Sequence, residues 1–161
     1  MSKNQERIRK CLKRMALTNS KPKGAIVYTS VTGNTEQLAE MVHAAILMEQ
    51  LPVSLYRIEE FPISELASYD YLLIGTYTWG SGEIPGELRT LYRAIEQLDH
   101  KLLKTAVFGT GDSFFAEFCG AVDRFRDMLY VKTQLRATLK VELLPQPSDR
   151  DRCKKLAQLM K

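Results

Sequence analysis

Short apolar runs alternate along the chain with stretches in which apolar residues recur every three or four positions. The short runs, each of a length suited to a strand, lie at residues 25–28, 53–58, 71–74, 106–108 and 135–143. Apolar residues at helical spacing lie between and after them, at residues 38–46, 88–95, 118–129 and 153–160. Strands that alternate with helices in this way predict βαβ units and an α/β fold with a parallel sheet.

The same pattern predicts the order of the strands. A strand that is buried on both faces is apolar throughout, whereas a strand with one wet face alternates. The first, third and fourth runs are continuous, and the second mixes apolar with polar residues. The fifth run alternates, and the residues expected on its apolar side are Leu135, Ala137, Leu139, Val141 and Leu143. Edge positions for the second and fifth strands fit the doubly wound order 2-1-3-4-5, in which ligands bind beyond the carboxyl ends of the strands, beside strands one and three.

The loop after the first strand predicts an anion site. Hydroxyl and amide side chains crowd the start of the next helix, at Ser30, Thr32, Asn34 and Thr35, and Gly33 permits a tight turn. Free N–H groups and the helix dipole favour a phosphate there. The loop lacks the lysine of a triphosphate-binding loop and the glycine spacing of a dinucleotide site. The alternative, that these residues only cap the helix, stays open at this point.

The loops after the third and fourth strands offer aromatic rings on a flexible backbone. Trp79, the only tryptophan, lies in the Gly-rich segment 76–85, and a glycine-containing loop at 109–115 ends in two phenylalanines. Such rings stack well on a flat ligand. Trp79 could instead fold back over the sheet, and Asp112 could merely form an Asx turn or cap a helix. Taken together, the three loops predict a ligand with a phosphate at one end and a planar ring at the other.

Charge is distributed unevenly along the 161 residues. Residues 1–23 carry a net charge of +7, residues 24–131 carry −8 and residues 132–161 carry +5. We expect residues 1–23 to be a basic extension, partly an amphipathic helix through Ile8, Cys11, Leu12 and Met15, with a linker at residues 20–24. Residues 24–161 would form the domain. Three scattered cysteines predict no disulfide or metal site, and the absence of a long apolar run or signal peptide predicts a cytoplasmic protein.

Three motifs of the chain closely resemble those of the flavodoxins. They are S-V-T-G-N-T-E at 30–36, Y-D-Y-L-L-I-G-T-Y-T-W-G-S-G-E-I-P at 69–85 and F-G-T-G-D-S-F-F-A-E-F-C-G-A-V-D at 108–123. The resemblance, to the short-chain type, implies a flavodoxin-like three-layer α/β/α sandwich and one non-covalent FMN. It also implies a low-potential one-electron carrier without catalysis of its own. Electrons would come from a flavodoxin or ferredoxin reductase and pass to acceptor enzymes, and the protein would be a monomer that neither enters a membrane nor binds nucleic acid.

The resemblance also assigns roles to single residues. Phosphate binding falls to Ser30, Thr32, Asn34 and Thr35, with the backbone of Val31 and Gly33. Trp79 and Phe115 would sandwich the isoalloxazine ring, and the Gly80–Ser81 peptide would turn to bond flavin N5 on reduction. The pyrimidine edge would contact Thr110, Gly111, Asp112 and Cys119. Further cofactor contacts are expected at Thr76, Tyr77, Thr78 and Gly82.

Some positions depart from the flavodoxin pattern. Phe115 stands where tyrosine is usual and Ser81 where an acidic residue is common, the stretch after Leu129 lacks the expected Gly turn, and the last helix is short. Two other functions remain open, an FMN reductase or flavin activator of another enzyme, and a flavin-free signalling module. The acidic middle segment predicts an acidic rim that steers basic partners. The basic ends are either solvated charge or contacts for acidic partners or nucleic acid.

Overall fold

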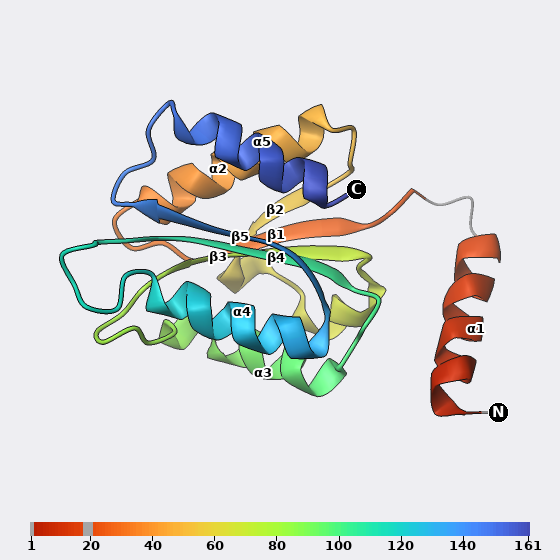
Figure 1. The fold of residues 1–161 in the computed structure, drawn as a ribbon. Coiled ribbons are helices and arrows are strands. Elements are labelled where there is room, and N and C mark those ends of the chain that lie inside the picture. The colour runs from red at the N-terminus through yellow and green to blue at the C-terminus, as the bar shows by residue number, and fades with distance from the viewer. Residues whose placement is uncertain (1, 18–20) are drawn as a thin grey trace.

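Five parallel strands form one sheet in the order β2-β1-β3-β4-β5 (Figure 1). The structure is a computed structural model that describes residues 2–17 and 21–161. The strands are β1 (Gly24–Tyr28), β2 (Ser54–Arg57), β3 (Tyr71–Tyr77), β4 (Lys104–Gly111) and β5 (Gln134–Glu142). The predicted fold class, strand order and edge strands are therefore confirmed.

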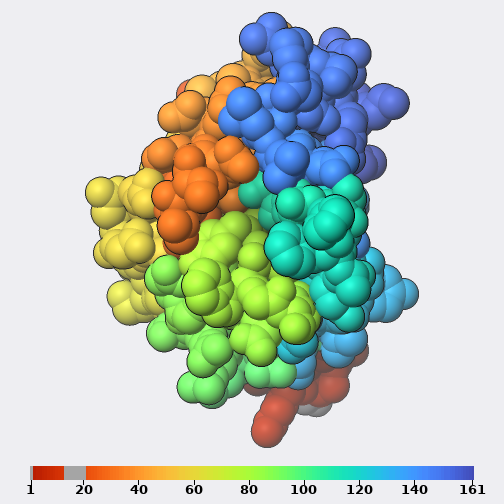
Figure 2. Space-filling view, turned by 90° about the vertical axis from the view of Figure 1, so that its left-hand side faces the viewer, coloured from red at the N-terminus to blue at the C-terminus, as the bar shows by residue number. Residues whose placement is uncertain are grey.

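Helices cover both faces of the sheet and complete a three-layer sandwich (Figure 1). In the space-filling view, the orange segment that follows the first strand and the blue C-terminal segment lie side by side at one end of this surface (Figure 2). On one face lie α2 (Asn34–Met48) and α5 (Asp149–Leu159), and on the other lie α3 (Arg89–Leu98) and α4 (Gly120–Lys132). Short 3₁₀ turns occur at Ile58–Glu60, Ile63–Ser68 and Gly86–Leu88. A further helix, α1 (Lys3–Leu17), stands beside the sandwich at the end where the chain enters β1.

Two apolar layers flank the central strands, because successive side chains of a strand point to opposite faces. Ile26, Leu73 and Phe108 are buried against α2 and α5, whereas their neighbours in β1, β3 and β4 are buried against α3 and α4. Burial on both faces explains why these three strands are continuously apolar in the sequence.

The predicted alternation of β5 is wrong at its first residue. Leu135 packs in the layer of α3 and α4, whereas Ala137, Leu139 and Val141 pack in the layer of α2 and α5. A β-bulge causes the change, because Thr105 of β4 pairs with Leu135 and Ala106 pairs with Ala137. Arg136 is the extra residue, and it shifts everything after it to the opposite face.

Helix α4 ends without the glycine that the flavodoxin pattern calls for. The N–H of Thr133 donates to the carbonyl of Leu129 at 2.8 Å, and the Thr133 hydroxyl donates to the same oxygen at 2.7 Å. That hydroxyl also pairs with the buried hydroxyl of Thr105 at 2.7 Å. A threonine that bonds the last carbonyls and β4 together therefore makes the short connection to β5 possible.

Two buried thiols predict a loss of stability at alkaline pH. Burial raises the pKa of Cys119 and of Cys153 from 9.0 to about 11. As the pH rises, the thiols of the unfolded chain lose their protons before the buried thiols do. Relative to high pH, the folded state is therefore favoured fully below pH 9, and this advantage is lost as the pH rises towards 11. Urea unfolding at neutral pH and at a pH of about 10 should show a smaller free energy of unfolding at the higher pH. The Cys119→Ala/Cys153→Ala variant should show a shallower decline, and an equal decline would assign the effect to other groups.

Candidate functional site

The loops after β1, β3 and β4 meet at the carboxyl edge of the sheet and enclose a cleft of about 270 Å³. Most of the lining comes from the positions that the sequence predicted. The lining residues are Ser30, Val31, Thr32, Asn34, Thr35, Tyr77, Thr78, Trp79, Thr110, Gly111, Asp112 and Leu143. Asp112 is the one charged member of this set, so the cleft offers an anion neutral donors rather than a cation.

The loop after β1 presents free N–H groups. Gly33 has a φ of +94°, a left-handed conformation that suits glycine, and its N–H donates to Ser30 Oγ at 3.1 Å. Within the described part of the chain, no group accepts a hydrogen bond from the N–H of Asn34, Thr35 or Glu36. No side chain caps the start of α2, so these donors remain available to an anion.

Thr35, at the start of α2, joins this loop to the end of β4. It is buried, and its hydroxyl lies 2.7 Å from the hydroxyl of Thr110, which is also buried. Both residues line the cleft. The hydrogen bond fixes the distance between the end of the cleft that is suited to phosphate and a loop that is suited to a ring.

An ion pair outside the cleft holds the phosphate-type loop in place. Arg57 of β2 bonds Glu36 at 2.8 Å and the carbonyl oxygen of Ser30 at 3.3 Å. Tyr28 also donates to Glu36 at 2.7 Å, and burial, reinforced by Glu36, raises the pKa of that phenol. Glu36 balances the charge of Arg57, so Arg57 supports the loop without adding a cation to the lining of the cleft.

Trp79 is exposed, with 63% of its surface accessible, so the alternative that it folds back over the sheet is wrong. A tight antiparallel turn carries it, in which the backbone groups of Trp79 and Glu83 bond each other at 3.1 and 2.7 Å. Gly80 and Gly82, inside the turn, have φ values of +52° and +89°. The turn therefore depends on conformations that other residues adopt only with strain.

The Trp79 turn also rests on the start of α4. A Cβ added to Gly120 would lie 2.6 Å from the Cα of Gly82, and a Cβ on Gly82 would lie 3.0 Å from the Cβ of Glu117. Glycine at both positions lets the two backbones touch. The loops after β3 and β4 are thus packed against each other.

In the loop after β4, Asp112 forms the Asx turn that its sequence context allowed. Its carboxylate accepts from the N–H of Phe114 at 2.9 Å, and its carbonyl accepts from the N–H of Phe115 at 3.1 Å. The two phenylalanine rings meet edge to face and are exposed, by 91% for Phe114 and 63% for Phe115. Neither ring is part of the cleft lining.

Seven residues from the predicted set do not line the cleft. They are Gly33, Thr76, Gly80, Ser81, Gly82, Phe115 and Cys119. Thr76 is buried in β3, and the buried thiol of Cys119 donates to the carbonyl oxygen of Gly109 at 3.9 Å. Conversely, Leu143 lines the cleft, although the alternation of β5 predicted it on the apolar face of that strand. It has a φ of +53° and its N–H bonds the carbonyl of Gly111 at 2.8 Å, which brings it to the cleft.

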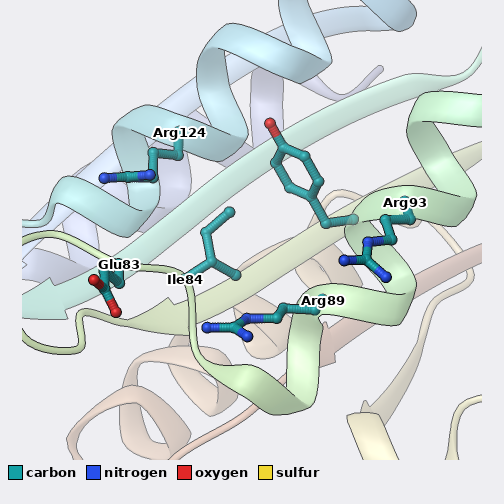
Figure 3. A pocket seen from close by; sticks show the side chains of 6 residues that line it. Glu83, Ile84, Arg89, Arg93 and Arg124 are labelled. Atoms are coloured by element: carbon teal, nitrogen blue, oxygen red, sulfur yellow. The ribbon is translucent and has the colours of Figure 1, made fainter.

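A second cleft shows that the charge near the site is mixed rather than uniformly acidic (Figure 3). It measures about 280 Å³, and Arg89 and Arg93 of α3 and Arg124 of α4 surround Ile84 in it. None of these arginines forms an ion pair with another described residue. Glu83, which pairs with Trp79, lines the same cleft, so basic and acidic groups both border the Trp79 turn.

The fold and cleft together define a class of protein. A doubly wound sheet with a cation-free anion loop beside an exposed tryptophan is suited to a flat mononucleotide at the switch point between β1 and β3. Comparisons with known proteins identify the family. The flavodoxin family profile matches residues 26–153.

Individual relatives agree with the profile. The probable flavodoxin 1 of Bacillus subtilis is 38% identical over 139 residues, which is 84% of this chain and 88% of the relative. The flavodoxin of Maridesulfovibrio salexigens is 41% identical over 110 residues, 66% of this chain and 75% of the relative. Oxidised flavodoxin 1 of Bacillus cereus superposes with a TM-score of 0.79 at 30% identity, covering 86% of this chain and 96% of the other. The chain belongs to the flavodoxin family. It is an FMN-binding electron-transfer protein rather than an enzyme, and its role implies redox partners.

Proposed function

We propose that the loop at residues 30–35 holds the FMN phosphate. The observation that carries this proposal is the set of free N–H groups of Asn34, Thr35 and Glu36 at the start of α2. The side chains of Ser30, Thr32, Asn34 and Thr35 add donors around them, together with the backbone of Val31 and Gly33. Because the lining holds no lysine or arginine, the dianion would be bound by neutral donors and the helix dipole alone.

The flavin ring would lie against Trp79, which lines the cleft and is exposed. Phe115 would cover the other face after the exposed Phe114–Phe115 pair moves towards the cleft. The backbone of Thr110, Gly111 and Asp112 would meet the pyrimidine edge. Cys119 could contribute only through its backbone, because its thiol is buried, and Thr76 would act through its backbone for the same reason. Tyr77, Thr78 and Gly82 would complete the wall on the Trp79 side.

Bound FMN supplies the redox chemistry, and the protein sets the potential. The Gly80–Ser81 peptide would turn so that its carbonyl oxygen accepts a hydrogen bond from N5–H of the reduced ring, and the left-handed conformation of Gly80 inside an exposed turn supports this role. A bond available in only one redox state separates the two one-electron steps. We expect a carrier of low potential, without catalysis of its own.

The donor would be a flavodoxin or ferredoxin reductase, and the acceptors would be redox enzymes. Residues 24–161 would form the FMN domain of a cytoplasmic monomer, with residues 1–23 as a separate basic extension. The free cysteines Cys11, Cys119 and Cys153 are consistent with a reducing compartment.

The visible spectrum of the purified protein tests this proposal. Bands near about 375 and 450 nm are expected for bound flavin. Stepwise reduction should give a blue species at half reduction, with absorption at long wavelength. A colourless protein that takes up no added FMN would refute the site, and reduction in a single two-electron step would refute the one-electron carrier.

Ser81→Asp should lower the second reduction potential. The exposed Ser81 lies in the Trp79 turn, and a carboxylate there would disfavour the negative charge that the flavin gains on full reduction. A surface charge near the flavin is largely screened by water, so we expect it to shift the second reduction potential by about 20–40 mV. Redox titration of Ser81→Asp beside the neutral Ser81→Asn separates charge from shape. Equal shifts in both variants would rule out an electrostatic effect.

A further inference from the structure

Helix α1 lies outside the domain that accounts for electron transfer. The flavodoxin match begins at residue 26, and α1 spans Lys3–Leu17. After this helix the chain is tied to the sandwich at Lys23, whose N–H donates to the carboxylate of Asp70 and whose carbonyl accepts from the N–H of Asp70, both at 2.7 Å. The expected linker at residues 20–24 begins outside the described residues. The structure of the flavin domain thus leaves α1 without a role.

The described part of α1 has an exposed apolar stripe. Ile8 and Leu12 lie one helical turn apart and are 42% and 60% exposed, and Cys11 lies between them in the same stripe. An apolar stripe along one face of a helix whose other faces are charged is typical of a helix that lies at an apolar interface.

Basic residues border that stripe on both sides. Arg7 and Arg9, the neighbours of Ile8, project about 100° to either side of it, as the geometry of an α-helix requires. Both are exposed. Residues 3–17 contain six Lys or Arg and a single Glu, and that glutamate is paired with Lys10 at 3.9 Å. The helix therefore combines an apolar stripe, cationic flanks and a strong net positive charge.

We propose that α1 lies on the surface of an anionic lipid bilayer and holds the flavin domain there. An apolar stripe with Lys and Arg along its borders suits the boundary between acyl chains and negatively charged headgroups. A nucleic acid would engage the basic residues but would leave Ile8 and Leu12 in water. An acidic protein groove would suit both groups, and it is the alternative that the test must separate. No described helix is long and apolar enough to cross a membrane, so α1 would lie in the interface.

The position of α1 fits this role. It stands at the end of the sandwich where β1 begins, opposite the loops after β1, β3 and β4 (Figure 1). A bilayer bound through α1 would therefore face the end of the molecule away from the flavin cleft. The cleft and the exposed Trp79 would remain open to redox partners.

Co-sedimentation with vesicles tests the proposal. We expect the full-length protein, counted by gel staining so that flavin content does not matter, to bind vesicles of phosphatidylcholine with phosphatidylserine and to bind pure phosphatidylcholine much more weakly. Ile8→Glu/Leu12→Glu should lower the partition coefficient at least about tenfold. Arg7→Glu/Arg9→Glu should do the same, at about fivefold for each basic residue removed from the surface.

Matched variants guard against general effects of charge and surface. Lys154→Glu/Lys155→Glu changes the net charge equally on the exposed side of α5, and Leu47→Glu alters an exposed leucine of α2. Both should bind like the parent protein, and circular dichroism of each variant reports its folding. Equal binding to both vesicle types, equal losses in the controls, or DNA binding that survives Ile8→Glu/Leu12→Glu without vesicle binding would overturn the proposal. Binding to acidic protein alone would overturn it as well.

Discussion

Asn34→Asp should weaken FMN binding by at least about 3 kcal/mol, or roughly a hundredfold in Kd. The change replaces an amide with a carboxylate of the same shape at the start of α2, in a lining that holds no Lys or Arg to offset the new charge. Repulsion between the carboxylate and the phosphate dianion then acts almost unopposed. Fluorescence titration of the apoprotein with FMN measures the change, because a flavin's emission is sensitive to its surroundings.

Two controls isolate the phosphate as the cause. Gln37→Glu adds the same charge at an exposed position of α2, beyond the free N–H groups, and should leave Kd within a few-fold of the parent value. Riboflavin, which lacks the phosphate, should bind parent and Asn34→Asp almost equally. Weakening of riboflavin and FMN by the same factor would show that the variant disturbs the ring site or the fold instead.

Trp79→Ala should cost about 1–3 kcal/mol of FMN binding, a factor of roughly five to a hundred and fifty, which is the range of base–aromatic stacking. Trp79 is exposed at the mouth of the cleft and supports no core, so the free energy of unfolding of the apoprotein should hardly change. The bound flavin should also become more fluorescent, since a stacked indole quenches it. Fluorescence titration with FMN measures the affinity and the emission of the bound flavin, and urea unfolding of the apoprotein measures the stability.

Trp79→Phe should retain most of the affinity because it keeps a flat ring. Phe114→Ala removes a ring that is 91% exposed and outside the lining, and it serves as the matched control. If Trp79→Ala unfolds at lower urea than the parent, Trp79 has a structural role. If Phe114→Ala loses as much affinity as Trp79→Ala, the assignment of the stacking ring must change.

The order of the strands was predictable because a strand that is buried on both faces is apolar at every position, whereas an edge strand is not. The strand order in turn determines where the loops after β1, β3 and β4 meet, so the location of the cleft was predictable as well. The ion pair between Arg57 and Glu36 was not predictable. It joins β2 to α2 at 2.8 Å, and no sequence motif relates two residues that lie this far apart in the chain. The three arginines around Ile84 likewise come together only through the packing of α3 on α4.

Leu143 shows a different limit. Alternation placed it on the apolar face of β5, but the strand ends at Glu142 and a φ of +53° turns the chain at Leu143 itself. The bulge at Arg136 instead displaces Leu135, because a pattern with a period of two does not show which residue of the strand is left unpaired. The start of α4 had a similar ambiguity: Phe118 shares the helical spacing but precedes the helix, which begins at Gly120.

The bulge at Arg136 marks a position at which β5 can lose a residue and keep its packing. The two residues that flank Arg136 already pair with consecutive residues of β4, so deleting Arg136 alone would give even pairing and leave Leu139 and Val141 on the face of α2 and α5. Deleting a residue between Leu139 and Val141 would instead turn one part of the strand towards the opposite helices. Length variation within β5 should therefore occur at the bulge, while the rest of this edge strand keeps its residue count even where its side chains change.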